Sequence, residues 1–168
     1  MKKIFLIFIT FLLFIGCGYK PSSYYARDAI SGDVYVDLSV DISNAQNSVY
    51  VKDAMIEMII NEFKANVTDD KTKADTFVTV ALSSVSHTTM STDDDGYASS
   101  YRTTVHISVT YQKRDQQKRT ISVSNYYDYN VDSTSTISDQ KKNTAVKIAA
   151  TKALTDVFSK IAIQDMKE

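Results

Sequence analysis

A chain of 168 residues with 19 basic and 20 acidic side chains carries a formal net charge of −1. That balance provides no bulk positive field to attract nucleic acid, so we expect no nucleic-acid partner. The chain contains a single cysteine and therefore no pair that could close a disulfide within it, which leaves packing to stabilise the fold. Its length corresponds to one domain.

The first sixteen residues have the pattern of a secretory signal peptide. Lys2 and Lys3 precede an apolar stretch from Ile4 to Ile15, and Gly16 stands directly before Cys17. At about 1.5 Å per helical residue the apolar stretch measures about 18 Å, which is too short to cross a hydrocarbon core of about 30 Å. We therefore predict that residues 1–16 are a removable signal and not a permanent span.

The position of Cys17 predicts its use. A lone cysteine in an exported protein forms an intermolecular disulfide, stays a free thiol or carries lipid. Bacterial lipoprotein signals place the lipid-bearing cysteine directly after the apolar segment and a small residue, so we predict that Cys17 is the lipid attachment site, with ordinary secretion as the alternative. Gly18 in place of aspartate favours the outer membrane by analogy with known sorting rules. Residues 17–32 show no sustained period and are expected to form a lipidated tether.

Strand and helix periods alternate in the first half of the predicted domain. Val34 to Ile42 alternates apolar and polar residues, which predicts a strand with one buried face. We expect a loop through Asn44 to Ser48 and then a helix over Val51 to Asn66, where apolar residues recur at helical spacing. Asp75 to Met90 has apolar residues on both faces near its start, which predicts a strand inside the sheet.

The second half contains two further strands and the longest helix. A loop at 92–96 leads to an alternating strand from Tyr101 to Tyr111, and a polar turn leads to a strand from Ile121 to Val131. Ser138 offers an N-cap for a helix from Asp139 to about Gln164. We expect the apolar stripe of that helix to be buried: Val146, Ala150, Ala153, Leu154, Val157 and Ile161.

The order β-α-β-β-β-α predicts an α+β fold of two layers, with a four-stranded mixed sheet and two helices packed on one face. A strand, helix and strand in sequence favours a right-handed crossover with parallel first and second strands, and the short turns make the later strands antiparallel. Residues 33–168 are then a single domain. The second face of the sheet is expected to be open and to carry small polar residues: Thr104, His106, Ser108, Thr110, Ser122 and Ser124.

The chain offers few groups for metal binding or catalysis. His87 and His106 lack the spacing of a ligand pair, the run of aspartates at 93–95 lacks the ligand spacing of an EF-hand, and no nucleophile elbow or phosphate loop is present. We therefore expect no metal, no cofactor and no enzymatic activity.

Four cations gather in the turn between the last two predicted strands: Lys113, Arg114, Lys118 and Arg119. Parallel first and second strands place this turn at the tethered end of the sheet. There the four side chains are expected either to remain solvated, with Asp115 relieving their repulsion, or to contact anionic headgroups or a partner protein.

The order and spacing of several short motifs resemble the outer-membrane lipopolysaccharide-assembly lipoproteins, the LptE family, and within it the epsilonproteobacterial branch. The resemblance covers nearly the whole mature chain. Its motifs are Cys17-Gly18-Tyr19-Lys20-Pro21, the strand Val34 to Ile42, the segment from Asn47 to Ala54, Asp95-Gly96-Tyr97, Tyr101-Arg102, Tyr126-Tyr127-Asp128-Tyr129 and the final Ala-rich helix.

The resemblance implies a non-enzymatic role at the outer membrane. Proteins of this family sit as a plug in a large β-barrel partner, help it to fold and support insertion of lipopolysaccharide into the outer leaflet. Small polar residues on the open sheet face would suit the wet interior of such a barrel. The family is thought to touch lipopolysaccharide phosphates near the loop after the second strand and the start of the last helix. The loop is acidic here, so the expected contacts are Lys141 and Lys142.

Two other functions compete with this interpretation. A pilot-type lipoprotein that escorts another outer-membrane complex, such as a secretin, would share the anchor and the small domain. A periplasmic lipid or cell-wall hydrolase would need a convergent group of catalytic side chains, which the sequence does not indicate.

Overall fold

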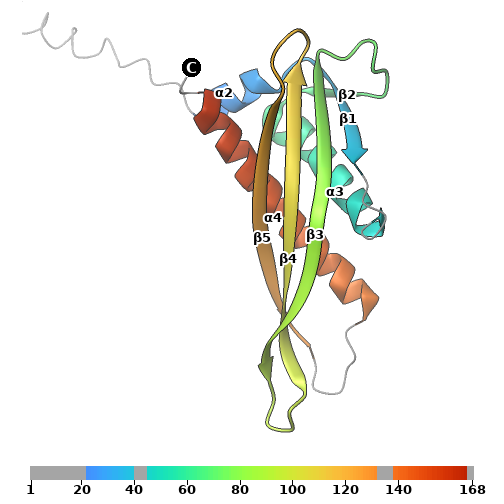
Figure 1. Cartoon of the computed structure of the whole chain (residues 1–168), viewed down its shortest axis with the longest axis vertical. Coiled ribbons are helices and arrows are strands. Elements are labelled where there is room, and N and C mark those ends of the chain that lie inside the picture. Colours follow the sequence, from blue (N-terminus) through green and yellow to red (C-terminus); the bar gives the residue numbers. More distant parts are fainter. Residues whose placement is uncertain (1–21, 40–44, 132–137, 166–168) are drawn as a thin grey trace, which may run out of the picture.

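The computed structural model describes residues 22–39, 45–131 and 138–165, and within these ranges it is an α+β fold with five strands and three α-helices (Figure 1). The order is α2 (Ser22–Ala29), β1 (Asp33–Ser39), α3 (Ala45–Met58), η2 (Ile59–Phe63), β2 (Asn66–Thr68), β3 (Thr76–Thr92), β4 (Ala98–Lys113), β5 (Arg119–Asn130) and α4 (Asp139–Asp165).

The five strands form one mixed sheet in the order β2-β1-β3-β4-β5. Strand β1 is parallel to both β2 and β3, whereas β3, β4 and β5 are antiparallel neighbours. The predicted parallel pair and the interior position of β3 are therefore confirmed. The described part of β1 pairs with β3 as far as Ala81. Beyond that point β3 and β4 form a long ribbon with β5, and the end of the β3–β4 hairpin projects beyond the body of the molecule (Figure 1).

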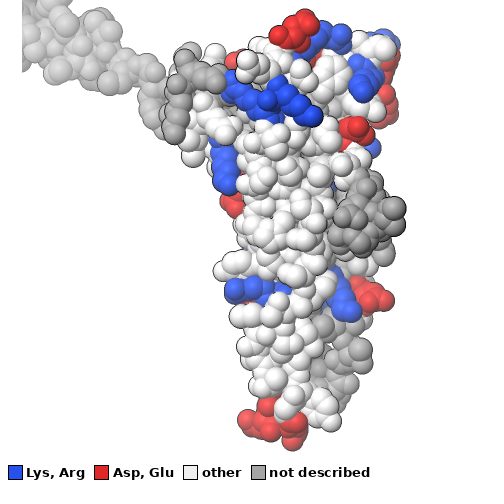
Figure 2. All heavy atoms as spheres, viewed as in Figure 1, with Lys and Arg blue, Asp and Glu red and all other residues white. Residues whose placement is uncertain are grey.

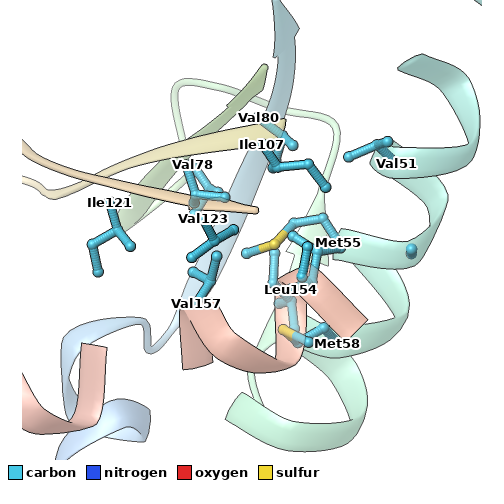
Figure 3. Packing of buried hydrophobic residues seen from close by; sticks show 14 of the residues in the cluster. Val51, Met55, Met58, Val78, Val80, Ile107, Ile121, Val123, Leu154 and Val157 are labelled. Atoms are coloured by element: carbon cyan, nitrogen blue, oxygen red, sulfur yellow. The ribbon is translucent and has the colours of Figure 1, made fainter. Parts of the chain in front are cut away.

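The helices cover one face of the sheet, and the core lies between the two layers. Side chains of α3 and α4 meet the inner face of the strands, as the buried residues labelled in Figure 3 show: Val51, Met55, Met58, Val78, Val80, Ile107, Ile121, Val123, Leu154 and Val157. Every residue of the predicted apolar stripe of α4 is buried. The stripe recurs at three- and four-residue intervals because such positions share one side of a helix.

Two elements of the fold are absent from the sequence prediction. The sheet has five strands instead of four because the short strand β2 joins its edge beside β1. A third helix, α2, occupies part of the stretch predicted as a tether, and it buries Ala26, Ala29 and Ile30 in the core. Small apolar residues at that spacing allow an eight-residue helix to pack closely against α4.

The boundaries of the first predicted helix are also corrected. Helix α3 begins at Ala45, inside the expected loop, and its last turn widens into the π-helical segment η2. The segment ends at Lys64, which has a left-handed backbone with φ of 59°, and the N–H of Ala65 donates to the carbonyl of Ile59 at 3.2 Å. Asn66, the expected last helical residue, therefore starts β2 instead.

Candidate functional site

The open face of the sheet is formed by those residues of β4 and β5 that point away from the helices. In β4 and β5 the odd-numbered residues from Val105 to Tyr111 and from Ile121 to Val123 are buried under the helices, and the residues between them point to the other face. The six small polar residues that were predicted for this face are all partly or fully exposed, as expected: Thr104, His106, Ser108, Thr110, Ser122 and Ser124.

Hydroxyl groups on this face satisfy one another across the strands. Thr110 Oγ1 and Thr120 Oγ1 lie 3.0 Å apart, and Ser122 Oγ donates to Ser108 Oγ at 3.4 Å. A shallow depression of about 530 Å³ lies in the middle of the face, where Ser84, His106 and Ser124 are among its lining residues. Paired hydroxyls lower the cost of removing the face from water, because their hydrogen bonds survive when another surface covers them.

Charge is distributed along the long axis of the molecule. Lys and Arg gather toward the end opposite the β3–β4 hairpin tip, Asp and Glu cover the tip, and the strand surface between them is largely uncharged (Figure 2). The loop at the tip carries Asp93, Asp94 and Asp95, and Asp93 Oδ1 accepts hydrogen bonds from the backbone N–H groups of Asp95 and Tyr97. The open face thus runs from an end that carries both basic and acidic side chains to an acidic tip (Figure 2).

One charged cluster stands on the open face in the projecting half of the ribbon. Arg102 and Asp128 are cross-strand neighbours, and the guanidinium donates to both carboxylate oxygens at 2.7 Å. The guanidinium carbon also lies 3.8 Å from the ring centroid of Tyr126, whose side chain is 45% exposed. The hydrogen bonds from Arg102 lower the pKa of Asp128. Arginine and tyrosine are enriched among the residues that supply most of the binding energy at protein interfaces.

Sequence analysis named these residues only in two separate motifs and missed the cluster because Arg102 and Asp128 lie 26 residues apart. The signal is present in the strand register. Pairing the two predicted strands through the Lys113 to Arg119 turn places Arg102 opposite Asp128, and opposite charges at such positions stabilise a sheet.

The predicted glycolipid contacts lie at the start of α4, on the helix side of the sheet. Lys141 lines a pocket of about 430 Å³ together with Tyr127 and Tyr129, while Lys142 Nζ lies 3.7 Å from Asp139 Oδ1. The rings of Tyr101, Tyr129 and Tyr127 stack in succession beside this pocket. The hydroxyl of Tyr129 is buried and has no hydrogen-bond partner among the described residues.

A histidine lies near the same helix start. His87 Nδ1 is 2.8 Å from Thr103 Oγ1, and partial burial of the ring, with the positive charge of Lys142, lowers its pKa. His106 is on the opposite face. The structure therefore does not bring the two histidines together.

The basic turn lies at the α2 end of the sheet, as predicted, but half of its charges serve the fold. Lys113 Nζ forms an ion pair with Asp28 Oδ1 at 3.6 Å, and the Arg114 guanidinium donates to the carbonyls of Thr72 and Ala74. These contacts fasten the β4–β5 turn to α2 and to the loop before β3. Lys118 is exposed, and Arg119 is partly buried at the start of β5.

Groups for metal chemistry do not converge in the described parts of the chain. No three His, Cys, Asp or Glu side chains lie together there as an ion would require. Nor does any described helix combine the length and apolar content that crossing a bilayer demands.

A family model described as "LptE: Lipopolysaccharide-assembly" matches residues 35–161. The chain belongs to the LptE family. The match runs from β1 into the last turns of α4 and therefore includes the complete open face and the start of α4. The predicted family is thus confirmed at this level. No curated protein sequence matches the chain.

Several solved lipoprotein structures are similar to this LptE-family chain. A putative lipoprotein from Caulobacter crescentus has a TM-score of 0.52 at 5% identity, with 88% of this chain and 97% of that chain covered. Rare lipoprotein B from Shewanella oneidensis has a TM-score of 0.49 at 13% identity, with 80% and 93% covered. An uncharacterized lipoprotein B from Nitrosomonas europaea has a TM-score of 0.47 at 11% identity, with 87% and 91% covered. At such low identity the Caulobacter structure supports the fold alone.

Proposed function

We propose that this chain is a non-enzymatic outer-membrane lipoprotein that plugs the lipopolysaccharide-transport β-barrel, assists its folding and supports insertion of lipopolysaccharide into the outer leaflet. The family match over residues 35–161 is the observation that carries the proposal. We also assign the chain to the epsilonproteobacterial branch of the family, on the order and spacing of its motifs from Cys17 to the final helix.

The open sheet face supplies the physical fit to a barrel interior. Its hydroxyls are paired across strands, its residues are small, and it lacks formal charge except at the Arg102–Asp128 pair among the described positions of β4 and β5. The lumen of an outer-membrane barrel is polar, so a surface of this chemistry loses little hydration energy when it docks there.

The protein is proposed to be anchored in the membrane through lipid attached to Cys17, which lies outside the described residues. Two or three acyl chains on one cysteine would hold the protein firmly to the periplasmic side of the outer membrane, whereas a single chain gives only reversible binding. Lys118, at the α2 end of the sheet, is then available to anionic headgroups or to the partner, while Lys113 and Arg114 already contact the fold.

Glycolipid contact is proposed at the start of α4. Lys141 lines a pocket beside the stacked tyrosines, and the positive end of the helix dipole adds to its charge, so a phosphate group would be stabilised there. Lys142 adds a second cation, partly neutralised by Asp139.

Depletion of the protein in its own bacterium tests the proposal. We expect less folded transport barrel in the outer membrane and less lipopolysaccharide on the surface, measured by immunoblotting of the barrel and by surface labelling of the glycolipid. Normal levels of both would overturn the proposal, and loss of a secretin ring instead would favour the pilot alternative.

Complementation of the depleted strain locates the docking face. The double variant Ser108→Arg and Ser122→Arg places two unpaired charges in the middle of the face, and burying them against a partner is costly. We expect it to lower barrel levels. The matched control Ser159→Arg places a charge on the exposed outer side of α4, and we expect a smaller loss from it.

A further inference from the structure

The second half of β3 forms a ribbon with β4 and β5, and this ribbon has two edges. The edges differ in whether side chains bond their outward-pointing backbone groups. Strand β5 forms one edge, and the second half of β3, beyond its pairing with β1, forms the other (Figure 1). An exposed edge presents unpaired N–H and C=O groups that can bind another strand, so native proteins commonly cap or charge such an edge. Only the β5 edge shows capping among the described residues.

Side chains of α4 and of β5 itself cap the β5 edge. Lys160 Nζ, on α4, donates to the carbonyl of Ser122 at 3.0 Å, and Asn125 Oδ1 accepts the N–H of Tyr126 at 2.7 Å. Asn125 Nδ2 in turn donates to Asp156 Oδ2 of α4 at 3.0 Å. These bonds satisfy outward backbone groups of β5 and show that its even-numbered residues direct them away from β4.

The direction of the backbone groups in β5 determines their direction in β4 and β3, because all three strands are antiparallel neighbours. Residues opposite one another alternate between bonded and non-bonded pairs, so the β4 residues opposite Ser122 and Tyr126 direct their backbone groups toward β3. The two residues are Ser108 and Thr104, so the even-numbered residues of β4 share this direction. Among them, His106, Thr104 and Arg102 pair in register with Ser84, Ser86 and Thr88 of β3. The three remaining residues of this stretch therefore direct their N–H and C=O groups to the free edge: Val85, His87 and Thr89.

Nothing in the composition of this edge opposes strand addition. Residues 76–92 contain no charged side chain, no proline and no glycine, and from Ser86 to Thr92 every residue is exposed. Within the described ranges no side chain donates to or accepts from the outward groups of His87. The edge between the bulges at Leu82/Ser84 and Thr89/Ser91 keeps a regular register with β4, which is the geometry an added strand needs.

We propose that the β3 edge from Ser84 to Thr89 binds an extended, uncharged segment of the barrel partner as an added β-strand. The inference rests on the proposed function, because it assigns part of the contact between the lipoprotein and its barrel. Strands within a closed barrel wall have no free edge, so the added segment must come from a loop or a chain end of the partner. Backbone hydrogen bonds supply the affinity, and the small Ser and Thr side chains select an uncharged strand.

Hydrogen exchange resolved to single amides tests this directly on the full lipoprotein, alone and in complex with its co-expressed barrel. In the free protein we expect fast exchange at Val85, His87 and Thr89 and slow exchange at Ser84, Ser86 and Thr88, which bond to β4. In the complex the three fast amides should slow at least tenfold.

Each other outcome overturns the proposal in a distinguishable way. Fast exchange that persists in an intact complex would exclude strand addition and leave the plug function standing. Slow exchange at the three outward amides of the free protein would show that the edge is already occupied, by a second copy if the protein is dimeric. If no complex forms, both the edge proposal and the plug function fail.

A pair of variants isolates the backbone bond. His87→Pro removes the central outward N–H without removing a bond to β4, whereas His87→Ala removes only the side chain and its contact with Thr103. We expect His87→Pro to bind the barrel about threefold to tenfold more weakly than His87→Ala, the effect of one hydrogen bond. Circular dichroism confirms that both variants fold, and equal affinities would overturn the proposal.

Discussion

At the residue scale, a glycine and an aspartate join the N-terminal segment to the sheet. Asp75 Oδ2 accepts the N–H of Asp33 at 3.0 Å, and Thr76 Oγ1 donates to the carbonyl of Ser31 at 2.8 Å. Gly32 has a φ of +77°, and a Cβ placed on it would lie 2.3 Å from Asp75 Oδ2. The corner therefore requires glycine for two reasons, its left-handed backbone and the space beside it.

The two described glycines provide a matched test of this corner. Gly96 also has a positive φ, of +85°, but no atom lies within 4 Å of an added Cβ. We expect Gly96→Ala to lower the free energy of unfolding by about 1 kcal/mol through backbone strain alone. Gly32→Ala should cost clearly more, because Asp75 must move and lose its bond to Asp33. Urea titrations of both variants measure the difference, and equal losses would contradict the steric argument.

The Arg102–Asp128 pair predicts a pH dependence. The folded-state pKa of Asp128 is depressed, so its contribution to stability is present above the unfolded pKa and is lost as pH falls through the folded value. We expect the melting temperature of the wild type to fall more below about pH 4 than that of Asp128→Asn. Asp94→Asn, at the hairpin tip, serves as the control. If the melting temperatures of the wild type and Asp128→Asn fall in parallel with pH, the pair contributes nothing to the stability of the fold.

At the element scale, α4 is the helix whose limits follow most directly from local chemistry. Ser138 Oγ accepts the N–H of Lys141 at 3.3 Å, Asp139 lies in the first turn, and the helix extends to Asp165. The expected start and buried stripe are both confirmed. Elements with weaker local signals were missed: β2 has three residues and α2 eight, and each is stabilised by neighbours distant in sequence.

The N-cap of α4 can be tested by substitution. Ser138→Ala leaves the N–H of Lys141 without its side-chain acceptor, and we expect a loss of about 1 kcal/mol in the free energy of unfolding. Ser138→Asp keeps an acceptor and adds a charge at the positive end of the helix dipole, so it should retain the wild-type stability. Chemical denaturation of the three proteins decides, and a Ser138→Asp variant as unstable as Ser138→Ala would refute the capping role.

At the scale of the whole molecule, one core joins three helices to a sheet whose β3–β4 hairpin projects from it at one end. Helix α4 contributes most to that core, since it contacts β4, β5, α2 and α3. Strands β4 and β5 carry the open face and the Arg102 cluster, and the β3 edge from Ser84 to Thr89 has no strand partner among the described residues. The residues of the open face alternate along β4 and β5 with the buried core residues and point to the opposite side of the sheet.

Two apolar residues of α4 allow a core position to be compared with a surface position. Leu154 is fully buried between α3 and the sheet, whereas Ile163 is 53% exposed near the helix end. We expect Leu154→Ala to cost about 2–5 kcal/mol in the free energy of unfolding, from lost burial and the cavity that remains. Ile163→Ala should change it by less than about 0.5 kcal/mol. A large effect at Ile163 in guanidinium titrations would show that this residue packs against more than solvent.

The sequence alone determined the strongly periodic elements, because each depends on the pattern of neighbouring residues. It also determined the α+β class, the open polar face and the resemblance to the LptE family, because these depend on the order and spacing of such patterns along the chain. The tertiary structure decided what depends on register and on distant partners. It placed Arg102 beside Asp128, used Lys113 and Arg114 within the fold, added β2 and α2, and left the outer edge of β3 beyond Ala81 without a strand partner among the described residues. Local patterns specify which face of an element is apolar, but only the assembled sheet determines which backbone groups stay unpaired.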